Sequence, residues 1–225
     1  MTERIGATSR HERIGAASRG ERIGVFGGTF DPIHVGHLVT AVNVRHALDL
    51  DRVLLVVAND PWQKADLPVT PALDRLALVE SAVAEVDGLE ASDLEIARGG
   101  VSYTADTVAT LRRLHPNGEL YVILGSDAAA LLPTWKRVEE VRATATLVVV
   151  TRPGADTLSP PPGWDHRAVE VPRLEVSSTD LRARFVDGRP LDWLVTPPVV
   201  HVIRQRGLYA VDQMRSRSSL RSAGS

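Results

Sequence analysis

Two histidines and a pair of glycines near the start of the chain have the types and spacing needed to bind phosphate. Gly27 and Gly28 let the backbone approach a ligand closely, and Thr29 adds a hydroxyl group. His34 and His37 are three residues apart, which places both imidazoles on one side of a first helical turn. A strand-to-helix junction of this kind exposes N–H groups at the positive end of a helix dipole. The segment therefore predicts an anion site in a nucleotide-handling enzyme.

The same segment has two other possible interpretations. In the first it is an ordinary turn, in which Gly-Gly and Asp-Pro are punctuation and Asp31 caps the helix. In the second the two histidines are half of a zinc site. The chain has no Cys and no His-Glu-x-x-His pattern, so zinc is disfavoured and we expect no metal held by protein ligands. The dinucleotide fingerprint is also excluded, because its third glycine is missing.

Strands and helices that would position these residues alternate along the chain. Continuous apolar runs predict strands buried on both faces, at residues 23–26, 53–57, 120–124 and 146–150. Helical periodicity predicts helices at residues 38–48, 72–86 and 104–114. The second of these helices is expected to bury Leu73, Leu76, Val79, Ala82 and Val83. This order predicts an α/β fold, a doubly wound Rossmann-like parallel sheet. Short helices at 178–185 and 199–206 would add a small C-terminal helical portion.

Polar candidate residues follow the predicted strands. The segments Pro61–Lys64 and Gly125–Asp127 come after the second and third apolar runs, and Arg152 follows the fourth. In doubly wound sheets ligands bind beyond the carboxyl ends of the strands. We therefore expect these residues to lie along one edge of the sheet, together with the histidine pair.

The segment Gly27-Gly28-Thr29-Phe30-Asp31-Pro32-Ile33-His34-Val35-Gly36-His37 resembles the signature of the nucleotidyltransferase superfamily. Its end is the His-x-Gly-His motif shared with class I aminoacyl-tRNA synthetases. Within the superfamily the chain most resembles bacterial nicotinate mononucleotide adenylyltransferases. The similarity covers residues 21–210 and includes four further segments: Pro61–Lys64, Ser102–Thr107, Gly125–Asp127 with Trp135, and Ser177–Arg182.

The resemblance implies a reaction and its partners. Nicotinate mononucleotide and ATP would be joined to give nicotinate adenine dinucleotide and pyrophosphate, a step of NAD biosynthesis. The attacking phosphate is mostly dianionic at neutral pH, so no general base is required. Catalysis then rests on aligning two polyanions and neutralising their charge. Mg²⁺ is expected as the cofactor, held mainly through the ATP phosphates.

The resemblance also implies roles for particular residues. The catalytic group would be His34, His37 and Arg182. ATP would bind to Gly27, Gly28, Thr29, Phe30, His34, His37, Gly125, Asp127, Ser178, Thr179 and Arg182. The mononucleotide would bind to Thr29, Lys64, Tyr103, Thr104, Trp135 and Arg152, with Trp135 stacking on the ring. Where the family usually has Pro-Pro-His-Lys, this chain has Gln63 before Lys64, so no titratable group is expected at that position.

Other functions stay open at this point. A related nucleotidyltransferase would act on nicotinamide mononucleotide or phosphopantetheine, or use a cytidylyl donor. A tRNA synthetase fragment is disfavoured, because no Lys-Met-Ser-Lys-Ser element is visible. A non-enzymatic nucleotide-binding protein is the alternative from a different class. The sequence leaves open the choice between acid and amide pyridine nucleotides and whether the chain forms a homo-oligomer.

Composition agrees with a cytoplasmic enzyme. The chain has 225 residues, 44% hydrophobic and 24% charged, with a net charge of −2. These values predict one soluble domain over residues 21–210, with no nucleic-acid partner and no membrane segment. A nine-residue repeat, beginning at Glu3, Glu12 and Glu21, predicts a disordered leader over residues 1–20. A transit peptide is the alternative for the leader. The Ser- and Arg-rich residues 211–225 predict a disordered tail.

Overall fold

The computed structural model describes residues 20–61, 68–154, 160–161 and 163–209. Lys64, residues 1–19 of the predicted leader and the predicted tail lie outside these residues. The elements are β1 (Arg22–Gly28), α1 (Val35–Ala47), β2 (Arg52–Val57), α2 (Ala72–Val83), β3 (Leu89–Ser92), α3 (Leu94–Arg98), α4 (Thr104–Leu114), β4 (Glu119–Gly125), α5 (Ser126–Ala130), the 3-10 turn η2 (Leu132–Thr134), α6 (Val138–Thr144), β5 (Thr146–Thr151), β6 (His166–Glu170), α7 (Ser178–Asp187) and α8 (Pro197–Gln205).

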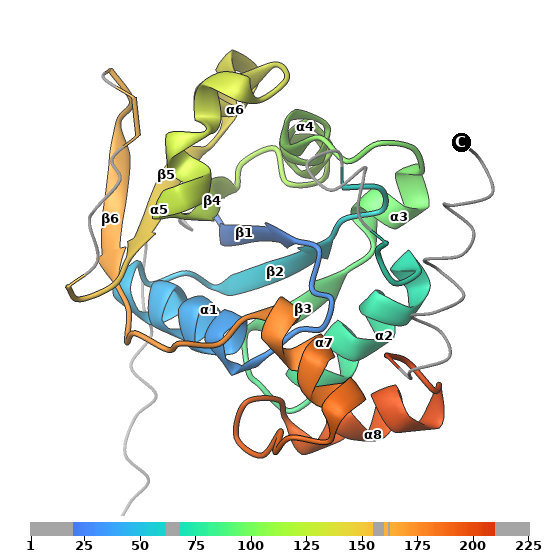
Figure 1. Cartoon of the computed structure of the whole chain (residues 1–225). Helices are drawn as coiled ribbons and strands as arrows, with labels where there is room; N and C mark the ends of the chain where they lie inside the picture. The colour runs from blue at the N-terminus through green and yellow to red at the C-terminus, as the bar shows by residue number, and fades with distance from the viewer. Residues whose placement is uncertain (1–19, 62–67, 155–159, 162, 210–225) are drawn as a thin grey trace, which may run out of the picture.

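A parallel sheet forms the centre of the fold (Figure 1). Its six strands lie in the order β3-β2-β1-β4-β5-β6, and every neighbouring pair is parallel. The strand order reverses between β1 and β4. Strands β2 and β3 extend the sheet on one side of β1, whereas β4, β5 and β6 extend it on the other side. The predicted doubly wound α/β fold is confirmed, and the point of reversal is where such sheets bind ligands.

Apolar side chains leave the sheet on both faces and form two cores. Along β2, Val53, Leu55 and Val57 belong to the core under α1, α2, α7 and α8. Leu54 and Val56 belong to the other core, which is covered by α4, α5 and α6. Figure 1 shows these two helical layers on opposite sides of the sheet. A strand covered on both faces must be apolar at every position, which explains the continuous runs in the sequence.

The C-terminal helices complete one of the two layers. Helix α8 buries Val199 and Ile203 in the core that also contains the buried side of α2. An exposed ion pair joins the Arg206 guanidinium to the Asp74 carboxylate at 2.8 Å. The predicted helical portion is confirmed and is part of the same core as the sheet. No helix in the described part of the chain combines the length and apolarity needed to cross a bilayer.

Two predictions about the elements were wrong in detail. Helix α2 does not bury Leu73, which is 66% exposed, and instead buries the charged side chain of Arg75. The same helix ends at Val83 rather than Val86, because residues 84–88 form turns. The short elements β3, α3, α5, α6 and β6 were not predicted. Each has four to seven residues, too few to show a period.

Candidate active site

The ends of the central strands leave open space where strand order reverses. Gly27 and Gly28 end β1, and Gly125 ends the neighbouring strand β4. A side-chain carbon placed at Gly27 or at Gly125 would meet no atom within 4 Å. Gly28 is different, because a carbon there would lie 2.7 Å from the Phe30 ring. Gly27 and Gly125 therefore lie next to space that a ligand could fill, whereas at Gly28 the packing of Phe30 leaves no space for a side chain.

The Phe30 side chain packs in the core beneath the loop that follows β1. The residue has a left-handed backbone (φ 49°), and its side chain is only 2% exposed. Its ring meets the His37 ring edge-on, with 5.0 Å between the centroids. The aromatic side chain therefore belongs to the core and fixes the imidazole from behind, so only the backbone of Phe30 is available to a ligand.

The two predicted histidines form a stacked pair at the start of α1. Their ring centroids are 3.8 Å apart and the planes are inclined by 22°. The His34 backbone N–H donates to His37 Nδ1 at 3.3 Å, which assigns the proton of a neutral His37 ring to Nε2. Burial lowers the pKa of His34 to about 4, and the positive charge of Arg152 acts in the same direction. His34 is therefore a neutral imidazole at pH 7.

Helix α7 begins against the same loop. The Ser177 side chain caps this helix by accepting from the Asp180 backbone N–H at 3.2 Å. Ser178 Oγ donates to the Pro32 carbonyl at 2.9 Å. Arg182 Nη1 donates to the Asp31 carbonyl at 2.7 Å. Although residues 31 and 182 are far apart in sequence, the structure brings this guanidinium to the loop that carries the histidine pair.

Thr179 sits beside that guanidinium. Its hydroxyl is exposed and accepts from Arg182 Nη2 at 3.3 Å. Because the capping role falls to Ser177, the hydroxyls of Ser178 and Thr179 are not used as caps. The interpretation of this segment as a simple helix cap thus accounts for one of its three hydroxyl residues.

A buried arginine links the loops that follow β1 and β2. Arg75 is 1% exposed, and within the described residues its guanidinium donates only to backbone carbonyls. It reaches Thr29 and Ala58, both at 2.7 Å, and also Thr70 and Asn59. Burial lowers the pKa of Arg75, and the charge of Asp31 opposes that shift. A guanidinium stays charged in proteins, so its donors hold these loops together.

Asp31 is part of the same buried network and does not cap α1. One carboxylate oxygen accepts from the Tyr209 hydroxyl at 2.7 Å, and the other from the Thr70 backbone N–H at 3.1 Å. The residue at the N-cap of α1 is His34. Burial raises the pKa of Tyr209, and the Asp31 charge adds to that effect. The interpretation of Asp31 as a helix cap was wrong, because its side chain binds the C-terminal end of the fold instead.

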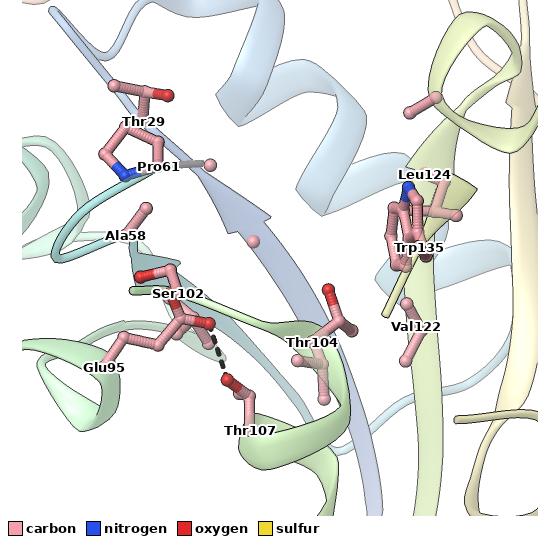
Figure 2. A pocket seen from close by; sticks show the side chains of 15 residues that line it. Thr29, Ala58, Pro61, Glu95, Ser102, Thr104, Thr107, Val122, Leu124 and Trp135 are labelled. Atoms are coloured by element: carbon pink, nitrogen blue, oxygen red, sulfur yellow. Dashed lines mark hydrogen bonds between the residues drawn. The ribbon is translucent and has the colours of Figure 1, made fainter. Parts of the chain in front are cut away.

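A cavity of about 160 Å³ opens beside the β1 loop, between α4 and the end of β4. Its lining includes Gly27, Thr29, Pro61, Thr104 and Trp135, as Figure 2 shows for the labelled residues. Trp135 Nε1 is buried and has no hydrogen-bond partner among the described residues. Thr104 and Trp135, which come from different parts of the chain, therefore share one pocket with the β1 loop.

The cavity also contains a carboxylate that the sequence did not reveal. Glu95, on α3, is 7% exposed and accepts from Thr107 Oγ at 2.5 Å. Figure 2 shows this bond at the base of the cavity. In the sequence Glu95 is a single acidic residue in a short segment without a period, so no pattern marks it as buried. Arg75 had a clearer signal, since it lies three or four residues before the buried Leu78 and Val79.

Three predicted site residues do not line this cavity. Tyr103 is the N-cap of α4 and does not line the cavity. Arg152 is exposed after β5, and its charge acts on His34. Asp127 is exposed in the first turn of α5. The described residues contain no group of three or more His, Asp or Glu arranged to hold a metal ion.

Sequence relatives define the class of protein to which the chain belongs. Residues 25–184 match the cytidylyltransferase-like family, which covers more than half of the chain. A probable nicotinate-nucleotide adenylyltransferase of Corynebacterium kroppenstedtii is 43% identical over 199 residues, which cover 87% of this chain and 94% of that protein. One from Streptomyces coelicolor is 44% identical over 185 residues, covering 81% and 98%. The chain therefore belongs to the nicotinate-nucleotide adenylyltransferases, a family of nucleotidyltransferase enzymes, as its motifs predicted.

Solved structures agree with the fold. The nicotinic acid mononucleotide adenylyltransferase of Plasmodium falciparum, complexed with NaAD, superposes with a TM-score of 0.69 at 20% identity. It matches 84% of this chain and 97% of that one. A putative nicotinate-nucleotide adenylyltransferase from Vibrio parahaemolyticus gives a TM-score of 0.61, also at 20% identity, over 84% and 95% of the chains. At these identities the likeness supports the architecture alone.

Proposed function

We propose that the chain transfers the adenylyl group of ATP to nicotinate mononucleotide, giving nicotinate adenine dinucleotide and pyrophosphate for NAD biosynthesis. The observation that carries this proposal is that Arg182 of α7 binds the loop that leads to the His34–His37 pair, and that the first residues of this loop line a pocket that contains Trp135. The names of the relatives support the same reaction.

The phosphate side of the site would act by charge and position. A phosphate oxygen of the mononucleotide attacks the α-phosphorus of ATP while the bond to the β-phosphate breaks. That oxygen is already ionised at neutral pH, so no side chain has to remove a proton. Arg182 is a permanent cation and His37 carries an N–H on Nε2, so both would stabilise the charge that develops on the phosphates. The hydroxyl of Thr179, the backbone N–H of Ser178 and the open backbone at Gly27 would hold the triphosphate beside them, since the Ser178 hydroxyl donates to the Pro32 carbonyl.

The neutral state of His34 suits a role in packing and hydrogen bonding. Its Nδ1 is buried without a hydrogen-bond partner among the described residues. The ring stacks on His37 and restricts its orientation. We propose that His34 contacts ATP as a neutral imidazole and that His37 is the more important of the two for turnover.

The other substrate would occupy the cavity. Trp135 offers a flat apolar face for the pyridine ring, and Thr104 a hydroxyl. Gly125 would leave room for the adenosine, and Asp127 would bind its ribose hydroxyls. Arg152 lies near His34, so a phosphate is a better partner for it than the pyridine carboxylate. Lys64 remains a proposed phosphate ligand, and Tyr103 would reach the substrate only through its backbone.

The donor set fits a metal that arrives bound to ATP. The acidic side chain of the phosphate loop, Asp31, is already engaged by Tyr209 and by the Thr70 amide. We therefore propose that Mg²⁺ is held by the triphosphate and by water, with no protein cage. It would neutralise phosphate charge when bound. A cytoplasmic location and a homo-oligomeric state remain predictions from the sequence.

A direct assay tests the proposed function. The purified chain would be incubated with nicotinate mononucleotide, ATP and Mg²⁺, and the products separated by liquid chromatography. Formation of nicotinate adenine dinucleotide and pyrophosphate in equal amounts is the expected result. Nicotinamide mononucleotide and phosphopantetheine, supplied in parallel, would reveal a related transferase. Binding of ATP without any product would indicate a non-enzymatic nucleotide-binding protein.

A further inference from the structure

The cavity beside the loop after β1 has negative charge and no positive charge among the described residues that line it. Among the described residues that line it, Glu95 alone is ionisable, and the other side chains are apolar or hydroxyl groups. Glu95 is 7% exposed. Its hydrogen-bond partner in the described part of the chain is the neutral hydroxyl of Thr107, at 2.5 Å. No ion pair between described residues includes this carboxylate.

A carboxylate in such a place favours a cationic ligand. Burial of a charge is unfavourable unless another charge or several hydrogen bonds compensate it. One hydroxyl supplies only one hydrogen bond, so a cation brought by the ligand would supply the remaining compensation. The indole of Trp135 lies on the other side of the cavity (Figure 2) and would also attract positive charge to its face.

We propose that Glu95 is the counter-ion of the pyridinium ring, so that the pocket selects acceptors by the positive charge of the ring. This inference rests on the proposed function. A pyridine ring joined to ribose through its nitrogen carries a full positive charge while it is aromatic. Between Glu95 and Trp135 that charge would face a carboxylate on one side and a π-face on the other. The exocyclic carboxylate of the ring must then point away from Glu95, since like charges repel.

The inference separates two ligands that differ chiefly in charge. Nicotinate mononucleotide has a cationic ring, and its 1,4-dihydro form has a neutral ring with the same carboxylate, ribose and phosphate. The measured quantity is the ratio of kcat/KM for the oxidised acceptor to kcat/KM for the reduced acceptor. The wild-type chain should prefer the oxidised form. At an effective dielectric constant of about 20, with salt screening, loss of the Glu95 charge should reduce this ratio about tenfold.

The experiment compares the wild type with Glu95→Gln, which keeps the size and an oxygen acceptor but removes the charge. Thr107→Val removes the hydrogen bond and keeps the carboxylate, so its ratio should stay close to that of the wild type. Glu90→Gln removes a carboxylate that pairs with Arg52 on the surface, and it should change neither acceptor. Circular dichroism and thermal unfolding would establish that each variant is folded.

Several results would overturn the inference. Equal use of the two acceptors by the wild-type chain would overturn it without any variant. This result would decide the matter even if Glu95→Gln does not fold. An equal loss for both acceptors in Glu95→Gln would assign the residue a structural role through Thr107. If the wild type forms no dinucleotide from either acceptor, the proposed function fails first. Formation of product with an unchanged ratio in Glu95→Gln rejects only the role of Glu95.

Discussion

The two sides of the candidate site are held in very different ways. The loop after β1 is bound by three side chains from two other helices: Arg75 of α2 to Thr29, and Arg182 and Ser178 of α7 to Asp31 and Pro32. After β4, the described hydrogen bonds of residues 126–135 are local, such as that from Thr134 Oγ to the Leu131 carbonyl at 2.7 Å. Gly125 and Asp127 are exposed there.

This difference matches two chemical tasks. Transfer between two polyanions requires donors that are already in place, because reorganisation during the reaction would reduce their electrostatic effect. A groove for the adenosine and the pyridine ring can be looser, since flat apolar surfaces tolerate small shifts. We therefore expect substitutions on the β1 side to affect turnover and stability. Substitutions on the β4 side should mainly affect KM.

The largest effect is expected for His37→Ala. In the proposed mechanism this change removes a hydrogen-bond donor to the phosphates, and loss of one preorganised donor usually lowers kcat by about 100- to 1,000-fold. Steady-state assays with nicotinate mononucleotide and ATP would measure it. His46→Ala, at the exposed end of the same helix, serves as the matched control and should behave like the wild type. Turnover within a factor of three of the wild type in His37→Ala would remove this residue from the reaction.

A somewhat smaller effect is expected for Arg182→Ala, about 100-fold in kcat/KM for ATP, because the proposed site loses the guanidinium that would bind the triphosphate. Lysine at the same position should recover only part of the activity, since it cannot hold the Asp31 carbonyl and a phosphate in the same geometry. Arg184→Ala is the control on the same helix, where the guanidinium pairs with Asp180 at 2.6 Å. Equal losses in both variants would show that helix stability, not phosphate binding, is being measured.

Arg75→Met tests whether the β1 side is held rigidly from within. The variant leaves four backbone carbonyls without their donor, so the free energy of unfolding should fall by about 2–4 kcal/mol. Urea unfolding followed by circular dichroism would measure the change. Arg113→Met removes an exposed guanidinium that contacts Thr110 and should change stability by less than about 0.5 kcal/mol. If both variants unfold alike, the loops after β1 and β2 do not depend on Arg75.

The same contrast explains what could be predicted from the sequence. The central strands were predictable because strands buried on both faces are apolar at every position, and β2 shows this directly. The glycines and the histidine pair indicated an anion site because phosphate binding favours those residue types at a strand-to-helix junction. Arg182 has no such local signal and followed only from the family resemblance, so the roles of these residues stay predictions. Short elements such as β3 and α5 were not predictable, since tertiary packing, rather than a local period, determines them.

Residues whose role depends on distant partners were also missed. Asp31 looks like a helix cap in sequence, and only the folded chain places Tyr209 against it. Leu73 fits the apolar period of α2 as well as its neighbours do, yet Arg75 takes the buried position because four carbonyls surround it there. A sequence pattern reports which face is apolar, and it cannot report which carbonyls a guanidinium will find.

The smallest effect is expected from the titration of His34. Its pKa is about 4 in the folded chain and near the ordinary value of 6.5 when unfolded, so the unfolded chain binds more protons between these values. This contribution to stability is complete above about pH 6.5 and is lost as the pH falls toward 4. The loss should amount to about 1–2 kcal/mol at pH 5.

Other groups titrate as well, so the wild type is compared with His34→Asn, which cannot titrate, by urea unfolding at pH 7 and pH 5. The wild type should lose more stability than the variant. Parallel losses would mean that folding leaves the pKa of His34 near its ordinary value, so that the ring is protonated in the folded chain at pH 5.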